Sequence, residues 1–495
     1  MRFFKILGGG LLLLIAVLVG RALMLAAPPT SSGQPIDIPV DGEAIARHLS
    51  ESIRFETISK QAPETLDPMM FEAFIDWASL TYPEFHQTLE RERVGTYSLL
   101  YIWTGSDPSL TPILLTAHYD VVPVIPGSEG DWEHPPFEGT IADGYVWGRG
   151  ALDDKSAVVT MYEAATQLLL QGFAPTRTIY FAFDHDEELG GHEGAGAVTE
   201  LLRSRGIELE WTLDEGSFFM QGLIPGIEAP VASINVAEKG YVTFEIVATG
   251  KGGHSSIPPP HTAVGKLATV IVKVEAHPMP GGIEGLMADG LDAIAPHTPF
   301  TFRIVLANRW LFDPLLEMAL SGAGPVNAML RTTTAATMLS ASVKENVLPI
   351  EAIATFNFRL HPRDTAEDVA THLKEVIQDD EIEIRQRGNE SSASSVSSTQ
   401  SEGFRDIAAA ARDVVTSAIV LPGITVGGTD SRHFSEIAED AYRFNPMIVT
   451  LDDVAGFHGT NERISIDNLE LATRFYLRLI ERSAGSDVGN DSGNE

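Results

Sequence analysis

The segment at residues 179–191 changes abruptly from an apolar strand to a run of ionisable side chains. Its first five residues, IYFAF, have the length and the aromatic and β-branched content of a buried strand. Five ionisable residues, DHDEE, follow before two glycines. So much charge at the edge of a buried sheet is costly unless a cation or a reaction uses it. Since the adjacent Glu187 and Glu188 cannot point the same way, one can bind a metal while the other faces whatever the metal binds.

Four other stretches carry histidine or acidic residues at comparable positions. Residues 113–117, 209–213 and 447–451 are predicted strands that run into such side chains, and GRGALDDK places two aspartates just before a helix. In open α/β sheets, ligands bind outside the carboxyl ends of the strands. We therefore expect five segments to deliver imidazole and carboxylate groups to one sheet edge, which indicates a metal centre. Besides Glu187 and Glu188, the side chains are His118, Asp120, Asp153, Asp154, Asp214, Glu215 and His458.

The chemistry of these groups limits the choice of metal. Imidazole and carboxylate ligands without thiolate suit Zn²⁺, with Mn²⁺ or Co²⁺ as possible substitutes. Two histidines and three carboxylates are too many for one tetrahedral zinc and suit two ions. A bridging carboxylate would then hold the ions about 3.5–4 Å apart, as in two-metal hydrolases.

The order of the predicted elements indicates an α/β fold. Strands and helices alternate up to residue 213, which predicts a doubly wound catalytic domain. From about residue 238 an alternating strand, a helix, two strands, a helix and a further strand predict an inserted α+β lid domain. A serine-dense tract at 389–401 reads as a flexible connection back to the first domain. We expect a catalytic domain at 41–237 and 389–483, the lid at 238–388, and a disordered polar tail at 484–495.

The amino terminus predicts a membrane segment. Residues 1–5 are basic, residues 6–20 are apolar, and a second apolar run follows Arg21. Counted across Arg21, the apolar length is near that of one membrane helix. We favour an uncleaved, single-pass signal anchor over a cleaved signal peptide at 1–27, followed by a linker at 28–40. Either way, the positive-inside rule places the catalytic body on the exported side.

Composition excludes several functional classes. The formal net charge of −34 argues against nucleic acid or anionic lipid as a partner of the soluble body. The chain has no cysteine, which rules out disulfides, thiolate zinc sites and a cysteine nucleophile. A G-x-S-x-G elbow, a P-loop and an H-E-x-x-H motif are also missing from the sequence.

Six motifs, in order along about residues 43–482, give the chain a specific resemblance. They are HYDVVP at 118–123, GRG at 148–150 leading to Asp153, DEE at 186–188, DEG at 214–216, GHS at 253–255 and HGTNE at 458–462. The chain thereby resembles the aminoacylase/carboxypeptidase S family of di-zinc metallopeptidases, especially its branch that hydrolyses N-acyl amino acids.

The resemblance implies a role for each residue of the metal centre. His118 and Glu188 would bind different zinc ions, Asp153 would bridge them, and Asp214 and His458 would complete the two sites. In the Asp214–Glu215 pair either carboxylate could be the ligand, and we favour Asp214. Asp120 would orient the His118 ring. Glu187 would be the general base that takes a proton from a metal-activated water and passes it to the leaving amine.

Further roles are implied for the lid and for one loop. His254 would donate a hydrogen bond to the tetrahedral oxyanion, in some relatives from the partner subunit. Arg359 and Asn346 would help to hold the substrate, and Arg432, in GGTDSRHF, would bind its carboxylate. A homodimer through the lid domain is therefore possible.

These expectations combine into one function. We predict zinc-dependent hydrolysis of the amide bond of small peptides, releasing the C-terminal residue, or of N-acyl amino acids. A strict dipeptidase and a non-catalytic binding scaffold with the same fold are the alternatives. The apolar insertion at 294–330 could serve lipidic acyl groups, the lid core or a dimer surface.

Overall fold

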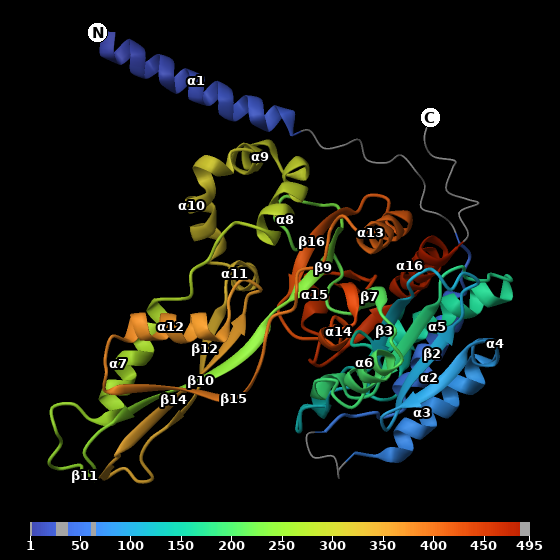
Figure 1. Cartoon of the computed structure of the whole chain (residues 1–495), viewed down its shortest axis with the longest axis horizontal. Coiled ribbons are helices and arrows are strands. Elements are labelled where there is room, and N and C mark those ends of the chain that lie inside the picture. Colours follow the sequence, from blue (N-terminus) through green and yellow to red (C-terminus); the bar gives the residue numbers. More distant parts are fainter. Residues whose placement is uncertain (1, 26–37, 61–65, 486–495) are drawn as a thin grey trace.

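The structure is a computed structural model that describes residues 2–25, 38–60 and 66–485. It contains two large β-sheets, each with its own packed helices, as Figure 1 shows. The larger sheet has ten strands in the order β1-β2-β6-β3-β7-β17-β9-β8-β18, with β16 paired to β9. Its strands are β1 (Glu90–Val94), β2 (Ser98–Trp103), β3 (Ile113–His118), β6 (Ile179–Asp184), β7 (Leu209–Asp214), β8 (Phe219–Met220), β9 (Val231–Glu238), β16 (Ile419–Thr425), β17 (Ala438–Arg443) and β18 (Ile448–Val449).

Helices cover both faces of this sheet because successive strand residues alternate between two cores. In β3, Ile113 and Leu115 join the core built with α5 and α16, whereas Leu114 joins the core on the other face, with α6 and α14. The neighbouring strands β6, β3, β7 and β17 are parallel, so their carboxyl ends meet at one edge. The helices are α2 (Gly42–Ile53), α3 (Pro68–Thr81), α4 (Pro83–Thr88), α5 (Lys155–Leu170), α6 (Ala195–Ser204), α13 (Glu402–Val414), α14 (Ser431–Phe434), α15 (Leu451–Val454) and α16 (Ile466–Ala484).

The smaller sheet has four strands in the order β12-β14-β10-β15 and a separate hydrophobic core. Helices α7 and α12 supply most of the helical side chains of that core. A two-stranded antiparallel sheet of β11 and β13 lies at the far end of this unit in Figure 1. The elements are β10 (Gly240–Thr249), β11 (Gly253–His254), α7 (Ala263–Ala276), β12 (Thr333–Ser340), β13 (Val347–Leu348), β14 (Glu351–Leu360), α12 (Ala366–Ile377) and β15 (Ile382–Ser391).

Three further parts of the described chain lie outside the two large sheets. The insertion between α7 and β12 folds as the helices α8 (Leu286–Ile294), α9 (Phe300–Leu306), α10 (Arg309–Leu320) and α11 (Gly324–Leu330). A small sheet of β4 (Thr140–Ala142), β5 (Tyr145–Trp147) and β19 (Arg463–Ser465) joins segments distant in sequence. At the amino terminus, α1 (Arg2–Met24) is the one helix among the described residues that is long and apolar enough to cross a membrane.

The mixed α/β class expected from the sequence is confirmed, with two local differences. The strand expected at 447–451 is only two residues long, because Thr450 and Asp453 form a capping box that starts α15 at Leu451. The serine-dense tract at 389–401 is not a free linker. Its Ser394 and Ser397 amides donate to Glu238 and Val236 of β9. The expected linker at 28–40 and tail at 484–495 lie almost wholly outside the described residues.

Candidate metal centre

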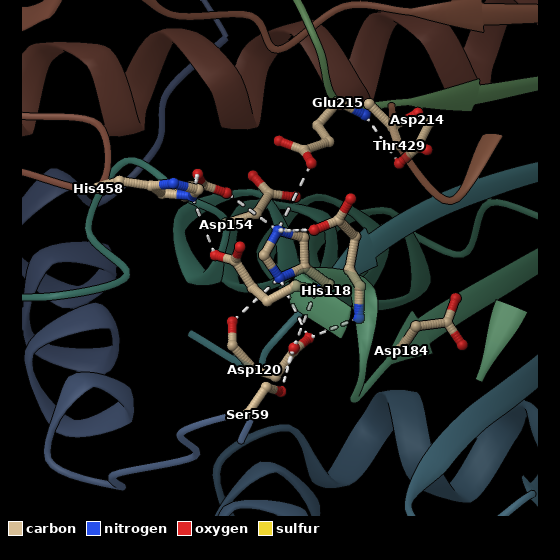
Figure 2. Close-up of polar contacts among 12 residues, drawn as sticks. Ser59, His118, Asp120, Asp154, Asp184, Asp214, Glu215, Thr429 and His458 are labelled. Carbon is tan, nitrogen blue, oxygen red and sulfur yellow. Dashed lines mark hydrogen bonds and ion pairs between the residues drawn. The ribbon is translucent and has the colours of Figure 1, made fainter. Parts of the chain in front are cut away.

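Side chains from five segments meet at the carboxyl edge of the larger sheet (Figure 2). His118 is the last residue of β3, and Glu187 and Glu188 lie in a 3₁₀ turn after β6. Asp153 precedes α5, and His458 lies in the loop after α15, with a left-handed backbone (φ 56°). The parallel order of the strands explains this convergence, as the sequence led us to expect.

The carboxylate of Asp153 lies between the two histidines. Its Oδ1 is 3.0 Å from His118 Nε2, and its Oδ2 is 3.0 Å from His458 Nε2. His458 Nε2 is also 3.2 Å from Oε1 of Glu188. One carboxylate therefore faces two separate imidazole groups, which is the arrangement that a ligand shared by two ions requires.

Asp214 and Glu215, at the end of β7, point in different directions. Glu215 Oε1 lies 3.6 Å from His118 Nε2, and Figure 2 shows its side chain directed at that ring. His118, Asp154 and Glu215 offer ligand atoms within 4.8 Å of one another. Asp214 instead accepts hydrogen bonds from the amides of Glu215 and Ser431, at 2.9 and 2.6 Å. In this conformation Glu215, rather than Asp214, faces the cluster.

Asp120 connects the histidine to the two glutamates. Its Oδ1 lies 3.3 Å from His118 Nδ1, on the ring edge opposite Asp153. Its two oxygens accept hydrogen bonds from the backbone amides of Glu187 and Glu188, both at 3.2 Å. The hydroxyl of Ser59 donates to the same carboxylate. Asp120 can therefore fix the His118 ring and the 3₁₀ turn together.

Burial and mutual repulsion alter the protonation of the acidic groups. Burial raises the pKa of Glu187 well above its usual value, and Glu215 and Glu188 add to the shift while His118 opposes it. Burial likewise raises the pKa of Glu215 to about 7. Hydrogen bonds to Asp153 and Glu188 raise the pKa of His458 to about 10. The centre thus holds more negative charge than its two imidazoles can balance.

This excess of carboxylate fits divalent cations. Asp154 Oδ2 is buried without a hydrogen-bond donor. Such oxygens cost free energy unless a cation or proton satisfies them. Imidazole and carboxylate donors without thiolate suit zinc. His118 belongs to both groups of candidate donors, and Asp153 faces both imidazoles. The residues present therefore fit a site for divalent metal.

A buried ion pair joins the loops that carry Asp153 and His458. Arg149 Nη1 lies 2.5 Å from Glu462 Oε2, and both side chains are fully buried. Glu462 Oε1 accepts hydrogen bonds from the backbone amides of Leu152 and Asp153. Arg149 Nη2 donates a hydrogen bond to the carbonyl of His458. Arg149 lies in the GRG motif and Glu462 in the HGTNE motif, but the sequence alone indicates no role for either residue.

His254 and Asn346 do not reach the metal centre of their own chain. His254 is exposed in β11, where its Nδ1 accepts hydrogen bonds from Ser256. The carbonyl of Asn346 accepts a hydrogen bond from the Ser255 amide, so His254 and Asn346 both lie at the β11–β13 sheet. Figure 1 shows β11 at the end of the smaller unit, far from β3 and β7.

The two arginines expected to hold substrate lie in different places. Arg359 is exposed on β14, with its guanidinium 5.1 Å from the centre of the Tyr241 ring. Arg432 lies in α14 and donates from Nε to the Thr429 carbonyl at 3.0 Å. The same loop reaches the Asp214 carboxylate through the Ser431 amide. Arg432 therefore follows directly after Ser431, whose amide contacts Asp214, whereas Arg359 belongs to the smaller unit.

Comparison with known proteins identifies related chains. The family described as Peptidase family M20/M25/M40 matches residues 114–482. An N-fatty-acyl-amino acid synthase/hydrolase of Xenopus tropicalis is 36% identical over 482 residues, covering 96% of this chain and 93% of its own. Carboxypeptidase S of Saccharomyces cerevisiae is 29% identical, covering 87% of this chain and 83% of its own.

Solved structures share the fold at low sequence identity. A metallo-carboxypeptidase of Sulfolobus solfataricus aligns with a TM-score of 0.62 and 19% identity, covering 88% of this chain and 98% of its own. Human carnosine dipeptidase 1 aligns with a TM-score of 0.61 and 18% identity, covering 89% and 96%.

Proposed function

Because this chain belongs to peptidase family M20/M25/M40, we propose that it hydrolyses the amide bond that joins an acyl or aminoacyl group to an amino acid bearing a free carboxylate. The family membership makes it a metallopeptidase or amidohydrolase. Relatives of nearly its full length are named for N-fatty-acyl amino acids and for carboxypeptidase S. Small peptides and N-acyl amino acids are therefore the substrates to test.

The position of Asp153 carries the proposal. Its carboxylate faces His118 on one side and His458 on the other, each at 3.0 Å. His118, Asp153 and Asp214 or Glu215 would hold one zinc ion, and Asp153, Glu188 and His458 would hold the other. Bound zinc supplies Lewis-acid stabilisation of negative charge and lowers the pKa of water. Co²⁺ or Mn²⁺ could substitute.

Glu187 is the proposed proton carrier. Its carboxylate lies 3.9 Å from His118 Nε2 and makes no hydrogen bond to a basic side chain among the described residues. Burial raises its pKa, which suits a group that accepts a proton from attacking water and donates it to the leaving amine. Asp120 would hold the His118 ring and the Glu187 backbone in fixed positions relative to each other.

The smaller unit is the proposed lid, at about 238–388. Since His254 and Asn346 lie far from their own metal centre, the lid of a second copy would bring His254 to the substrate as an oxyanion donor. Arg359 and Asn346 would contact the substrate, and Arg432 would bind its carboxylate. This assignment requires a homodimer.

Helix α1 is the proposed membrane anchor. Its span of 22 residues has a mean hydropathy of 2.3. An uncleaved anchor at 1–27 would leave the catalytic body on the exported side, joined through 28–40.

A panel of dipeptides and matched N-acyl amino acids tests the function. Zinc-dependent release of the C-terminal amino acid from both classes, or from the N-acyl class, is the expected result. Activity on dipeptides with a free amino group alone would identify a strict dipeptidase. Bound zinc without hydrolysis of any member would contradict the proposal and favour a binding scaffold.

Replacing Glu187 by Gln tests the mechanism. Glu187→Gln keeps the shape of the side chain but cannot accept the proton, so kcat should fall roughly 10²–10⁴-fold. Metal analysis should still give the wild-type zinc content, since Glu187 is not a proposed ligand. Undiminished turnover with normal zinc would exclude Glu187 as the base.

A further inference from the structure

The insertion helices α9 and α10 expose an apolar face. None of the 7 residues of α9 or the 12 of α10 is buried. On α10, Trp310, Leu311, Leu315 and Met318 are 40–68% exposed. At about 100° per residue, they fall within an arc of roughly 140° on one side of the helix. Phe300 and Phe302 of α9 are 43% and 57% exposed. Exposed apolar patches such as the one on α10 mark interaction surfaces.

The charge of this segment differs from that of the rest of the chain. Residues 293–312 contain no Asp or Glu, in a chain with 68 acidic residues among 495. The segment does contain Arg303 and Arg309, the second of which pairs with Asp292 at 3.0 Å. Most of the acidic surface would be repelled by phosphate headgroups. In contrast, α9 has no acidic residue, and α10 has only Asp313 and Glu317, the second of which pairs with Arg331 at 3.4 Å.

The apolar face is held beside the end of α1. Arg21 Nε donates to the Ala307 carbonyl at 2.9 Å, and Asn308 Nδ2 donates to the Leu18 carbonyl at 3.0 Å. Ala22 is fully buried in the same contact region, although most of α1 is exposed. Figure 1 shows α9 next to the carboxyl end of α1. The position of α1 therefore sets the position of α9.

The depth of this contact corresponds to a membrane interface. Leu18 lies six residues before Met24, where α1 ends. At a rise of 1.5 Å per residue, that is roughly 9 Å along the helix. Helices that lie in a membrane surface bury their apolar face about 5–10 Å into the boundary between headgroups and acyl chains. If α1 spans a bilayer, the end of α9 and the start of α10, which contact α1, lie at that depth.

We propose that α9 and α10 form a membrane-docking surface, which inserts its apolar face into the leaflet where α1 leaves the bilayer. This surface goes beyond the proposed hydrolysis and rests on the proposed anchoring by α1. We favour a lipid surface over a second protein chain as the partner, because the contact with α1 places the apolar face at the depth of the boundary between headgroups and acyl chains. The docking would fix how the catalytic body stands on the membrane.

Site-directed labelling of the full chain tests this surface. The protein has no cysteine, so Met318→Cys places a single spin label on the face without further changes. Leu80→Cys is the matched control, because Leu80 is 82% exposed on α3, in the larger unit. Both proteins are reconstituted into phosphatidylcholine vesicles, and collision with oxygen or a water-soluble nickel complex is measured.

Each outcome decides between the alternatives. The label at 318 should collide with oxygen dissolved in the lipid. Its collision rate with the nickel complex should be at least several-fold lower than that of the label at 80. Equal nickel accessibility at both positions would overturn the proposal. Protection at 318 that also appears in detergent and rises with protein concentration would overturn it in favour of a second copy.

Two further measurements separate anchoring from docking. Flotation with the vesicles reports on α1, so floating protein with an aqueous label at 318 would refute the docking surface alone. Brominated lipids should quench the fluorescence of Trp310, and Trp310→Phe should remove most of that quenching. Hydrolysis of a soluble substrate should be unchanged in each variant, so failure of the docking proposal is distinguishable from failure of the proposed function.

Discussion

At the scale of single residues, the two acids that end β7 differ in their partners. Asp214 already accepts two backbone amides, and burial raises its pKa to about 6. Glu215 faces His118 at 3.6 Å without a backbone donor among its described contacts. The motif resemblance favours Asp214 as ligand, whereas the orientation of the side chains favours Glu215.

Metal analysis of two single variants decides between these acids. Asp214→Asn and Glu215→Gln both remove one negative charge and keep the side-chain size. The true ligand variant should lose one of two zinc ions, or bind it at least 10-fold more weakly, while the other variant keeps both. Equal zinc loss in both variants would show that the two carboxylates act together.

His361, next to the end of β14, carries a pH-dependent contribution to stability. Burial, aided by the charge of Arg363, lowers the pKa of His361 to about 4 from its ordinary 6.5. Between these pH values the unfolded chain binds a proton that the folded chain does not, so stability rises with pH across about 4 to 6.5. Above that range the contribution is complete.

The variant His361→Gln should lack this rise. Denaturant unfolding from pH 4 to 8 should give a wild-type free energy of unfolding that increases relative to the variant up to about pH 6.5 and then runs parallel. A constant difference over the whole range would show that His361 titrates alike in both states.

At the scale of elements, one ion pair joins two loops more than 300 residues apart. The Arg149–Glu462 pair holds the GRGALDD turn against the HGTNE loop. Gly150, with φ of 89°, lies in this turn, and a Cβ there would be 2.9 Å from Val121. The turn is thus fixed from both sides, which places Asp153 between the two histidines.

Breaking this pair should loosen both the fold and the metal centre. Glu462→Gln leaves the buried Arg149 unpaired, so the unfolding free energy should fall by about 3–5 kcal/mol. Zinc affinity should fall with it, since Asp153 and His458 lose a shared support. As a control, Glu72→Gln removes an exposed pair with Arg93 and should cost less than about 1 kcal/mol. Equal effects in the two variants would contradict the positioning role.

At the scale of the whole molecule, the distance between His254 and the metal centre bears on assembly. A hybrid dimer of a Glu187→Gln subunit and a His254→Ala subunit has one site in which both residues are intact, if His254 acts across the interface. The isolated hybrid should then have about half of the wild-type rate, although each homodimer is impaired. No recovery in the hybrid would place any action of His254 within its own chain.

The sequence by itself determined the family and the residue types of the centre. The family resemblance is confirmed, and the fold class is mixed α/β. Since the strands β6, β3 and β7 are parallel neighbours, motifs at their carboxyl ends had to converge. This made it predictable that His118, Glu188 and the Asp214–Glu215 pair lie at one edge.

Tertiary structure decided what depends on packing between distant segments. The choice of Glu215 or Asp214 to face His118 depends on which backbone amides lie nearby, and the Ser431 amide comes from residues 217 positions away. The pairing of Arg149 with Glu462 and the seating of α9 on α1 likewise join segments separated by some 300 residues. Local patterns do not encode such contacts, because burial and side-chain direction arise only when the whole chain is packed.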